Sequence, residues 1–139
     1  MEILVIDGQG GGLGRQLVAA VQQAVPDARI TAVGTNSQAT AAMRKAGAHR
    51  TATGENAVVV ACRKADVIVG PIGMVIADAL LGEITPAMAL AVAQSPARRL
   101  LLPVSHCDNL VAGVEDSSVA RLVQCAADTL RQLAEENEK

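Results

Sequence analysis

The 139-residue sequence contains no phenylalanine, tyrosine or tryptophan, although half of its residues are hydrophobic. We therefore expect a core of valine, leucine, isoleucine, alanine and methionine, which suits helices packed on a sheet. The missing aromatics exclude a stacking platform for a base or a flavin, and they exclude tyrosine as a catalytic acid. The length predicts one domain over residues 1–139 with a hydrophobic core.

Charge, cysteine and long apolar runs are also scarce. The formal net charge of −2 gives no basic surface, so we expect no nucleic-acid partner. Three cysteines, Cys62, Cys107 and Cys125, have no metal-ligand spacing, and no signal peptide precedes the first strand. We expect a reduced, cytoplasmic protein without a metal site. The longest apolar stretch, residues 67–81, is interrupted by proline, glycine and aspartate, so we expect no membrane partner.

Short apolar strands alternate with amphipathic helices along the whole chain. This pattern predicts a three-layer α/β Rossmann-like fold with a mostly parallel sheet of about five strands. The expected strands cover residues 3–7, 29–33, 49–51, 66–69 and 99–104. The connection to residues 109–114 is too short for a parallel crossover, so a sixth strand there would be antiparallel at an edge.

Local signals place the ends of several helices. Gly47 is the expected C-cap of the second helix. Thr53 is the expected cap of the third helix, because its hydroxyl can accept from free amides. Two helical pieces parted by Gly82 follow the fourth strand, and the second piece begins with Thr85 at the N-cap and Pro86 at N1.

The most informative feature is a glycine loop between the first strand and the first helix, Gly8-Gln9-Gly10-Gly11-Gly12-Leu13-Gly14. A strand, a glycine turn and a helix N-terminus together form an anion pocket, because amide groups and the helix dipole point at it. The loop therefore predicts phosphate or nucleotide binding. The alternative is a tight strand-to-helix turn that binds nothing.

The glycine spacing resembles two known patterns. Gly8-x-x-x-Gly12-x-Gly14 resembles the loop of short-chain dehydrogenases and reductases, and Gly8-x-Gly10 resembles the wider dinucleotide fingerprint. The chain has no tyrosine, so the Tyr-x-x-x-Lys catalytic pair of those reductases is absent. A P-loop, a receiver domain and a haloacid-dehalogenase site are excluded, because their lysine or aspartate signatures are missing.

The carboxyl ends of the strands supply the remaining candidates, because parallel sheets bind ligands at that edge. We expect NAD(P) or another nucleotide to bind there. The candidate cofactor-binding residues are Asp7, Gly8, Gln9, Gly10, Gly11, Gly12, Leu13, Gly14, Thr35, Asn36, Ser37, Gly70, Pro71, Ile72 and Gly73.

The end of the second strand leaves the type of nucleotide open. It carries Thr35, Asn36 and Ser37 and lacks the acidic residue that binds the ribose of NAD. These residues could receive a 2′-phosphate with Arg15 or Arg44, bind a mononucleotide, or only cap the next helix.

Three further groups have both a functional and a structural interpretation. Asp7 either approaches a pyrophosphate or accepts hydrogen bonds from loop amides. Glu55 and Asn56 either contribute to the ligand site or cap a helix, and Glu83 is interpreted as plain surface. Residues 105–108, Ser-His-Cys-Asp, place a cysteine beside a histidine and form either an activated thiol or a polar turn.

Five runs along the chain resemble, in order, an uncharacterised bacterial domain-of-unknown-function family of small Rossmann-like proteins. The runs cover residues 6–12, 34–37, 52–57, 70–73 and 82–88. The resemblance implies the fold and implies no activity.

The sequence therefore predicts a nucleotide- or dinucleotide-binding protein whose reaction, if any, is undefined. The alternative is a ligand-sensing, regulatory or assembly subunit without catalytic activity. We expect a homo-oligomer, a dimer, that buries the apolar helices between Ile72 and Ala93.

Overall fold

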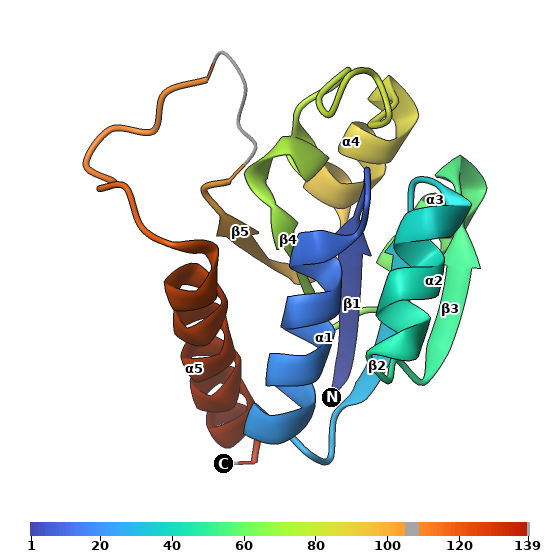
Figure 1. Cartoon of the computed structure of the whole chain (residues 1–139). Helices are drawn as coiled ribbons and strands as arrows, with labels where there is room; N and C mark the ends of the chain where they lie inside the picture. Colours follow the sequence, from blue (N-terminus) through green and yellow to red (C-terminus); the bar gives the residue numbers. More distant parts are fainter. Residues whose placement is uncertain (105–108, 139) are drawn as a thin grey trace.

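The computed structural model describes residues 1–104 and 109–138, in which helices and strands alternate (Figure 1). The elements are, in chain order, β1 (Glu2–Asp7), α1 (Gly12–Ala24), β2 (Arg29–Gly34), α2 (Ser37–Lys45), β3 (Arg50–Thr53), α3 (Glu55–Cys62), β4 (Val67–Pro71), the 3-10 helix η1 (Ile72–Val75), α4 (Pro86–Gln94), β5 (Arg98–Leu102) and α5 (Val119–Asn137).

The five strands form one parallel sheet in the order β3-β2-β1-β4-β5. This is the strand order of a Rossmann fold up to its fifth strand. The winding direction reverses between β1 and β4, and ligands of such sheets bind beyond the carboxyl ends of the strands at this switch point. The predicted three-layer, mostly parallel fold is confirmed.

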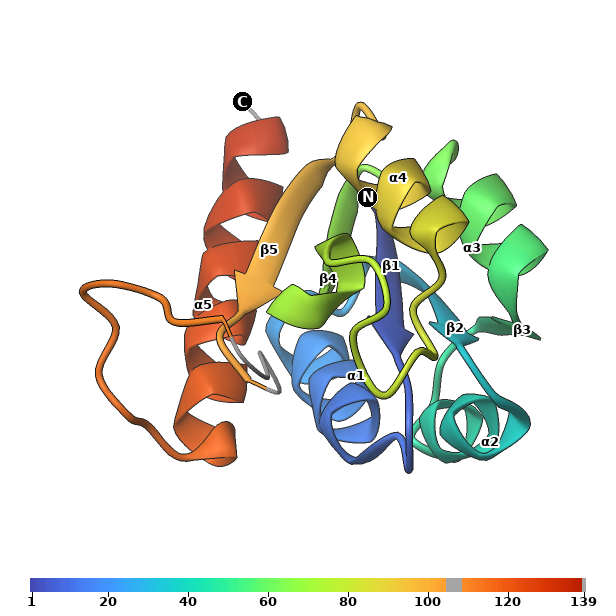
Figure 2. The ribbon, with the colours of Figure 1, turned by 90° about the horizontal axis from the view of Figure 1, so that it is seen from above.

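Helices cover both faces of the sheet (Figure 2). Ile3 and Val5 of β1 point into a core under α1, α2 and α5, whereas Leu4 and Ile6 point into a second core under α3 and α4. Because both faces are buried, β1 reads as a continuous apolar run. Aliphatic side chains and methionine fill both cores, as the composition predicts.

One of the predicted helix ends is confirmed, one is shifted by a residue because the C-cap of α2 is Ala46, and one is wrong. The hydroxyl of Thr85 accepts from the amide of Met88, directly before Pro86, and Gly47 has a φ of 113° after α2. Thr53 does not cap α3, because Gly54 is the N-cap and the Thr53 hydroxyl lies 2.7 Å from that of Thr40.

The segment between β4 and α4 differs from the prediction of two helical pieces. Its first part is only the short helix η1. Beyond it, Asp78, Leu80 and Leu81 have φ values of 68°, 57° and 56°, and Gly82 has a φ of 88°. Left-handed backbone cannot continue a right-handed helix, so the segment is a loop, here called the Glu83 loop (residues 76–85).

Residues 109–114 form no strand, so the expectation of an antiparallel edge strand is wrong. The amide of Val114 bonds to the carbonyl of Val111, and Gly113 has a φ of 79°, so the segment turns on itself. Leu110 is 93% exposed and contributes nothing to a core that would hold a strand there. Residues 105–108, with the cysteine and histidine pair, lie outside the described residues.

None of the helices in the described part of the chain combines the length and the apolar character that crossing a membrane requires. Of the two described cysteines, Cys62 is buried in the second core and Cys125 is exposed on α5. Cys125 lies outside the core, because the buried stripe of α5 passes through Val123, Ala126 and Leu130.

Candidate functional site

The glycine loop turns sharply between β1 and α1. The amide of Gly11 bonds to the carbonyl of Gly8 at 3.0 Å, and the left-handed conformations of Gln9 (φ 50°) and Gly11 (φ 74°) close the turn. Gly11 is the N-cap of α1, so the helix begins at Gly12. The predicted strand, loop and helix are therefore all present.

Three of the loop glycines are required by close packing. A Cβ atom at Gly8 would lie 2.7 Å from Thr35 Oγ1, and one at Gly14 would lie 2.6 Å from Met43 Sδ. A Cβ atom at Gly11 would lie 2.8 Å from a backbone atom of α2. Real Cβ atoms do not approach other atoms so closely, so these glycines serve the packing of the loop against α2 and β2.

Gly10 and Gly12 have no such role. A Cβ atom at either position would meet nothing within 4 Å, and neither residue has a positive φ. Both residues are exposed. Among the described residues, none accepts a hydrogen bond from the amide of Gly12 or Leu13.

The buried side chain of Asp7 caps the glycine loop. Its carboxylate is 6% exposed and accepts from the amide of Gly14 at 2.6 Å, as one of the two sequence interpretations predicts. Burial raises the pKa of Asp7 above its ordinary value, and the charge of Glu83 adds to the rise. The hydrogen bonds from the amides of Gly14 and Gly8 lower the pKa, but their effect is smaller. The carboxylate therefore stabilises the first turn of α1.

The end of β2 lies beside the glycine loop. The amide of Thr35 bonds to the carbonyl of Asp7, and the Asn36 side chain donates to the carbonyl of Gln9 at 2.9 Å. Asn36 also caps α2 through Ala39. Ser37 begins α2 and is exposed, with no side-chain hydrogen bond to a described residue.

The end of β4 forms the adjoining part of this edge of the sheet. Gly70 is buried where β4 meets β1, and a Cβ atom there would collide with the carbonyl oxygen of Ile6. Pro71, Ile72 and Gly73 follow at the start of η1. No hydrogen bond among the described residues joins residues 70–73 to the glycine loop. The close contact with Ile6 is enough to explain the glycine at position 70.

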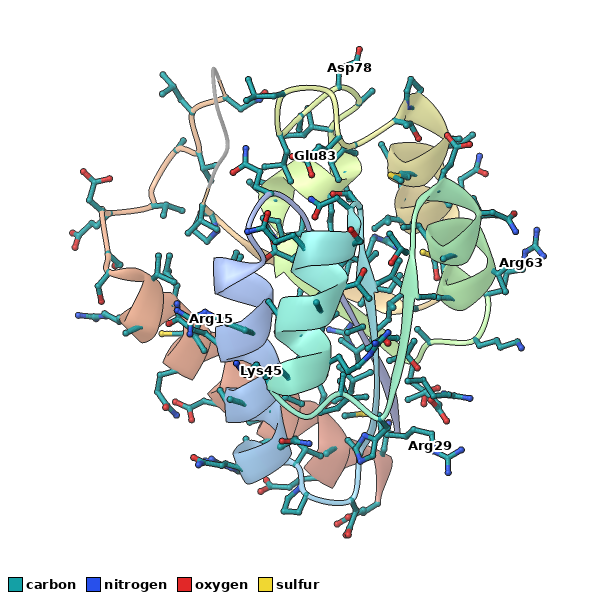
Figure 3. The ribbon with its side chains drawn as sticks, turned by 45° about the vertical axis from the view of Figure 1, so that its right-hand side comes forward. Arg15, Arg29, Lys45, Arg63, Asp78 and Glu83 are labelled. Carbon is teal, nitrogen blue, oxygen red and sulfur yellow. The ribbon has the colours of Figure 1, made fainter. Side chains whose placement is uncertain are left out.

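The sequence interpretation missed Glu83, whose carboxylate lies against the glycine loop. Its Oε1 atom accepts from the amide of Gln9 at 2.9 Å, from Thr35 Oγ1 at 2.6 Å and from Asn36 Nδ2 at 2.7 Å. Figure 3 shows Glu83 above the ends of α1 and α2. Burial raises its pKa, but the three hydrogen bonds outweigh that effect and hold the pKa below its ordinary value.

The other candidate side chains lie elsewhere. Arg44 is in the last turn of α2, at the opposite end of that helix from Thr35, and it donates to Thr51. Arg15 extends on the side of α1 that faces α5 (Figure 3). Glu55 accepts from the Thr85 hydroxyl at 2.5 Å and so ties the start of α3 to that of α4.

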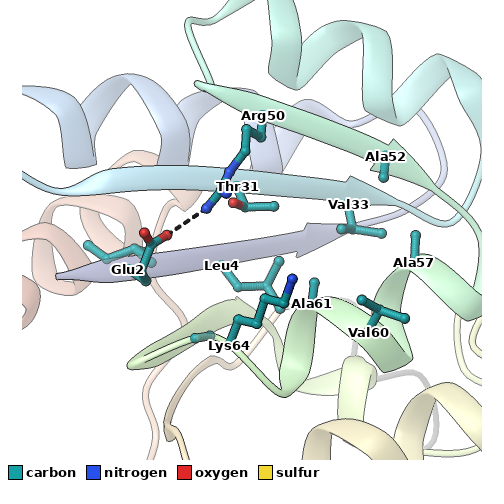
Figure 4. Close-up of a pocket in the computed structure, with 12 residues that line it drawn as sticks. Glu2, Leu4, Thr31, Val33, Arg50, Ala52, Ala57, Val60, Ala61 and Lys64 are labelled. Carbon is teal, nitrogen blue, oxygen red and sulfur yellow. Dashed lines mark hydrogen bonds and ion pairs between the residues drawn. The ribbon is translucent and has the colours of Figure 1, made fainter.

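A separate pocket of about 220 Å³ lies between α3 and the face of the sheet (Figure 4). Ala57, Ala61 and Val60 line it on the helix, and an ion pair of 2.9 Å between Arg50 and Glu2 borders it. The pocket shares no residue with the glycine loop. Its lining is mostly small and apolar, and it also includes the cationic side chains of Arg50 and Lys64.

Within residues 1–104 and 109–138, no three histidine, cysteine, aspartate or glutamate side chains gather closely enough to hold a metal ion.

Comparisons with known proteins identify the family of the chain. A search of curated proteins found no match. Among solved structures, the chain is similar to a dodecameric FMN-dependent UbiX-like decarboxylase from Escherichia coli O157:H7, at 17% identity and a TM-score of 0.47. That similarity covers 95% of this chain and 76% of the decarboxylase chain. A family model matches residues 2–135, so the chain belongs to the family described as Domain of unknown function (DUF3842).

Proposed function

We propose that the chain binds a nucleotide, a dinucleotide of the NAD(P) type, with its phosphates on the glycine loop. The observation that carries this proposal is the difference between the loop glycines. Packing explains Gly8, Gly11 and Gly14, whereas nothing in the described part of the chain requires glycine at Gly10 or Gly12. A ligand that approaches the backbone closely would require it, because any side chain there would fill the ligand's place.

The start of α1 offers the matching chemistry. The free amides of Gly12 and Leu13 point out of the N-terminal end of a 13-residue helix, where the dipole favours an anion. Thr35 and Asn36 would lie near a ribose, because they end the strand next to β1. We place residues 70–73 at the opposite wall of the same site.

Substitution of the two unexplained glycines tests the proposal. Gly10→Val and Gly12→Val add bulk where only a ligand would meet it. We expect each to weaken binding of NADH or AMP about tenfold or more, the loss that follows when a charge-assisted hydrogen bond worth roughly 1.5–3 kcal/mol is removed. Ala19→Val is the control, because it places the same valine side chain at an exposed position of α1.

Binding is measured by titration calorimetry and by NADH fluorescence, which no protein aromatic group obscures. Mass spectrometry of the supernatant from acid-treated protein reveals a nucleotide retained through purification. Wild-type protein that binds no nucleotide, or valine variants that bind as well as wild type, would refute the proposal.

Assembly is a second candidate role, because apolar side chains remain exposed between Ile72 and Ala93. Leu81 is 95% exposed and Leu90 is 55% exposed, and both lie in the region expected to form a dimer. Apolar area of this kind is commonly covered by a partner. Sedimentation of wild type and Leu90→Ser, with and without NAD, tests a dimer and its response to ligand. A monomer under all four conditions would refute this role.

A further inference from the structure

A carboxylate from another part of the chain lies at the end of β2, which has no acidic residue of its own. Rossmann domains that bind NAD place an acidic residue at this strand end, where it accepts hydrogen bonds from the ribose. Here the strand ends at Gly34, and Thr35 follows it. The structure brings Glu83 to the same place from 48 residues further along the chain, with its Oε1 atom 2.6 Å from Thr35 Oγ1.

The two oxygen atoms of Glu83 have different surroundings. Oε1 accepts all three hydrogen bonds, from Gln9, Thr35 and Asn36, which hold the carboxylate in one orientation. Oε2 receives no hydrogen bond from any described residue, and the side chain is half-buried rather than enclosed. One oxygen is therefore an anchor, and the other is an oriented acceptor without a donor.

The loop that presents Glu83 has an unfavourable backbone. Asp78, Leu80 and Leu81 are left-handed without being glycine, and Gln9 in the facing loop is left-handed as well. Such residues cost on the order of 1 kcal/mol or more each and concentrate at ligand sites, where the surrounding structure holds them. The hydrogen bond from the Gln9 amide to Glu83 joins these two loops.

From these observations we infer that Glu83 is the ribose-binding carboxylate of the proposed nucleotide site, where Oε2 accepts hydrogen bonds from the 2′- and 3′-hydroxyls. The inference rests on the proposed nucleotide binding and specifies its ligand class. The ligand has a free ribose diol, as NAD and AMP do, and a 2′-phosphate as in NADP is rejected.

Charge explains the rejection of a 2′-phosphate. A phosphate in place of the 2′-hydroxyl would bring two negative groups together beside Glu83. The two arginines that could offset this charge do not reach it, because Arg44 bonds to Thr51 at the far end of α2 and Arg15 faces α5.

A competing interpretation treats Glu83 as a plug that a ligand phosphate must displace. The geometry favours the ribose acceptor, because Glu83 binds the amide of Gln9 and leaves those of Gly12 and Leu13 free. The donors for a phosphate and the anchor for the carboxylate are therefore different groups of the same loop.

Selectivity for NADH over NADPH, measured by calorimetry on purified full-length protein, tests the inference. We expect wild type to bind NADH at least about tenfold more tightly than NADPH, because the charged site repels the added phosphate. Glu83→Gln keeps a hydrogen-bond acceptor and removes the charge, so we expect the two affinities to converge to within about threefold. Glu83→Ala should lose most of the preference for AMP over 2′-deoxy-AMP, because the acceptor for the 2′-hydroxyl is gone.

Asp78→Asn is the matched control, because it removes one charge from the same loop. Asp78 points away from the glycine loop (Figure 3), and asparagine tolerates its left-handed φ. This variant should keep the wild-type preference for NADH, and circular dichroism verifies that each variant is folded.

The outcomes separate the inference from the proposal beneath it. Wild type that binds no nucleotide overturns both. Wild type that binds nucleotide, with the same NADH to NADPH ratio in Glu83→Gln, overturns only the role of Glu83. Tighter binding of every nucleotide by Glu83→Ala would identify a plug and overturn the ribose contact in the same way.

Discussion

The amide of Gly14 donates a hydrogen bond of 2.6 Å to the carboxylate of Asp7, so a buried anion stabilises the first turn of α1. The helix dipole favours the charge at this place, but the loss of water opposes it. Burial is the larger effect, since the pKa of Asp7 is raised above 3.8, its ordinary value. The folded state therefore binds a proton at Asp7 more tightly than the unfolded state does.

The raised pKa predicts a pH-dependent effect of Asp7→Asn on stability. The favourable contribution of protonated Asp7 is complete below its ordinary pKa and is lost as the pH rises through the raised pKa of the folded state. Asparagine keeps an acceptor for Gly14 and has no charge. We therefore expect the stability of Asp7→Asn, relative to wild type, to increase from pH 4 upward until Asp7 is fully ionised.

Urea unfolding at a series of pH values measures this difference. Glu83→Gln is the control, because the pH dependence of its stability relative to wild type should have the opposite sign. The pKa of Glu83 is lowered in the folded state, so its favourable contribution is present above its ordinary value of 4.5 and is lost as the pH falls. A difference between Asp7→Asn and wild type that is constant with pH would contradict the burial effect.

The two kinds of loop glycine predict opposite effects on stability. Gly14→Ala would place a Cβ atom 2.6 Å from Met43 Sδ and 2.8 Å from Asp7 Cβ, so we expect a loss of about 1–3 kcal/mol from overpacking. Gly12→Ala meets no atom, and alanine is the better helix former, so its stability should be unchanged or higher by up to about 1 kcal/mol.

Denaturant unfolding without added ligand measures both glycine variants. Equal destabilisation by the two alanines would mean that packing requires Gly12 as well, which would remove the main support for a ligand at the loop.

Features that depend on neighbouring residues could be predicted from the sequence. The apolar run of β1, the glycines after it and the periodicity of α1 indicate a strand, a turn and a helix, and all three are present. Thr85 and Pro86 mark the start of α4 for the same reason. Such signals act over a few residues, and the chain carries them in order.

Glu83 could not be placed in this way, because its partners Gln9, Thr35 and Asn36 are 47 to 74 residues away in sequence. Only the folded loop brings them together. The run that includes Glu83 belongs to the family resemblance, and this was the one sequence signal for it. Thr53 was misplaced for a similar reason, because its hydroxyl meets Thr40 across two elements instead of capping its own helix.

Thr40 is the second buried polar group that determines the shape of this region. Its side chain is 3% exposed and contacts the carbonyls of Asn36 and Ala52 and the hydroxyl of Thr53, at 3.1, 3.2 and 2.7 Å. Valine has a similar shape and no hydroxyl. We expect Thr40→Val to cost about 1–3 kcal/mol, because the hydrogen bonds of a buried hydroxyl are lost.

Thr53→Val is the matched control for Thr40→Val. It removes the same hydroxyl contact from the other side, but residue 53 is exposed. We expect a smaller loss for this variant in thermal and urea unfolding. Equal losses for the two variants would show that the buried carbonyl contacts of Thr40 contribute nothing.

The two described cysteines predict different reactivity toward a thiol reagent. Cys62 is 2% exposed, and burial raises the pKa of its thiol to about 11, whereas Cys125 is exposed on α5. Only the thiolate reacts, and each unit by which a pKa exceeds the pH lowers the thiolate fraction about tenfold. In a Cys107→Ser background at neutral pH, one thiol should therefore react at least about a hundredfold faster than the other.

Mass mapping should place the fast modification on Cys125, and urea should make the rates similar. Fast modification of Cys62 in the folded protein would mean that α3 opens readily, in conflict with its place in the second core.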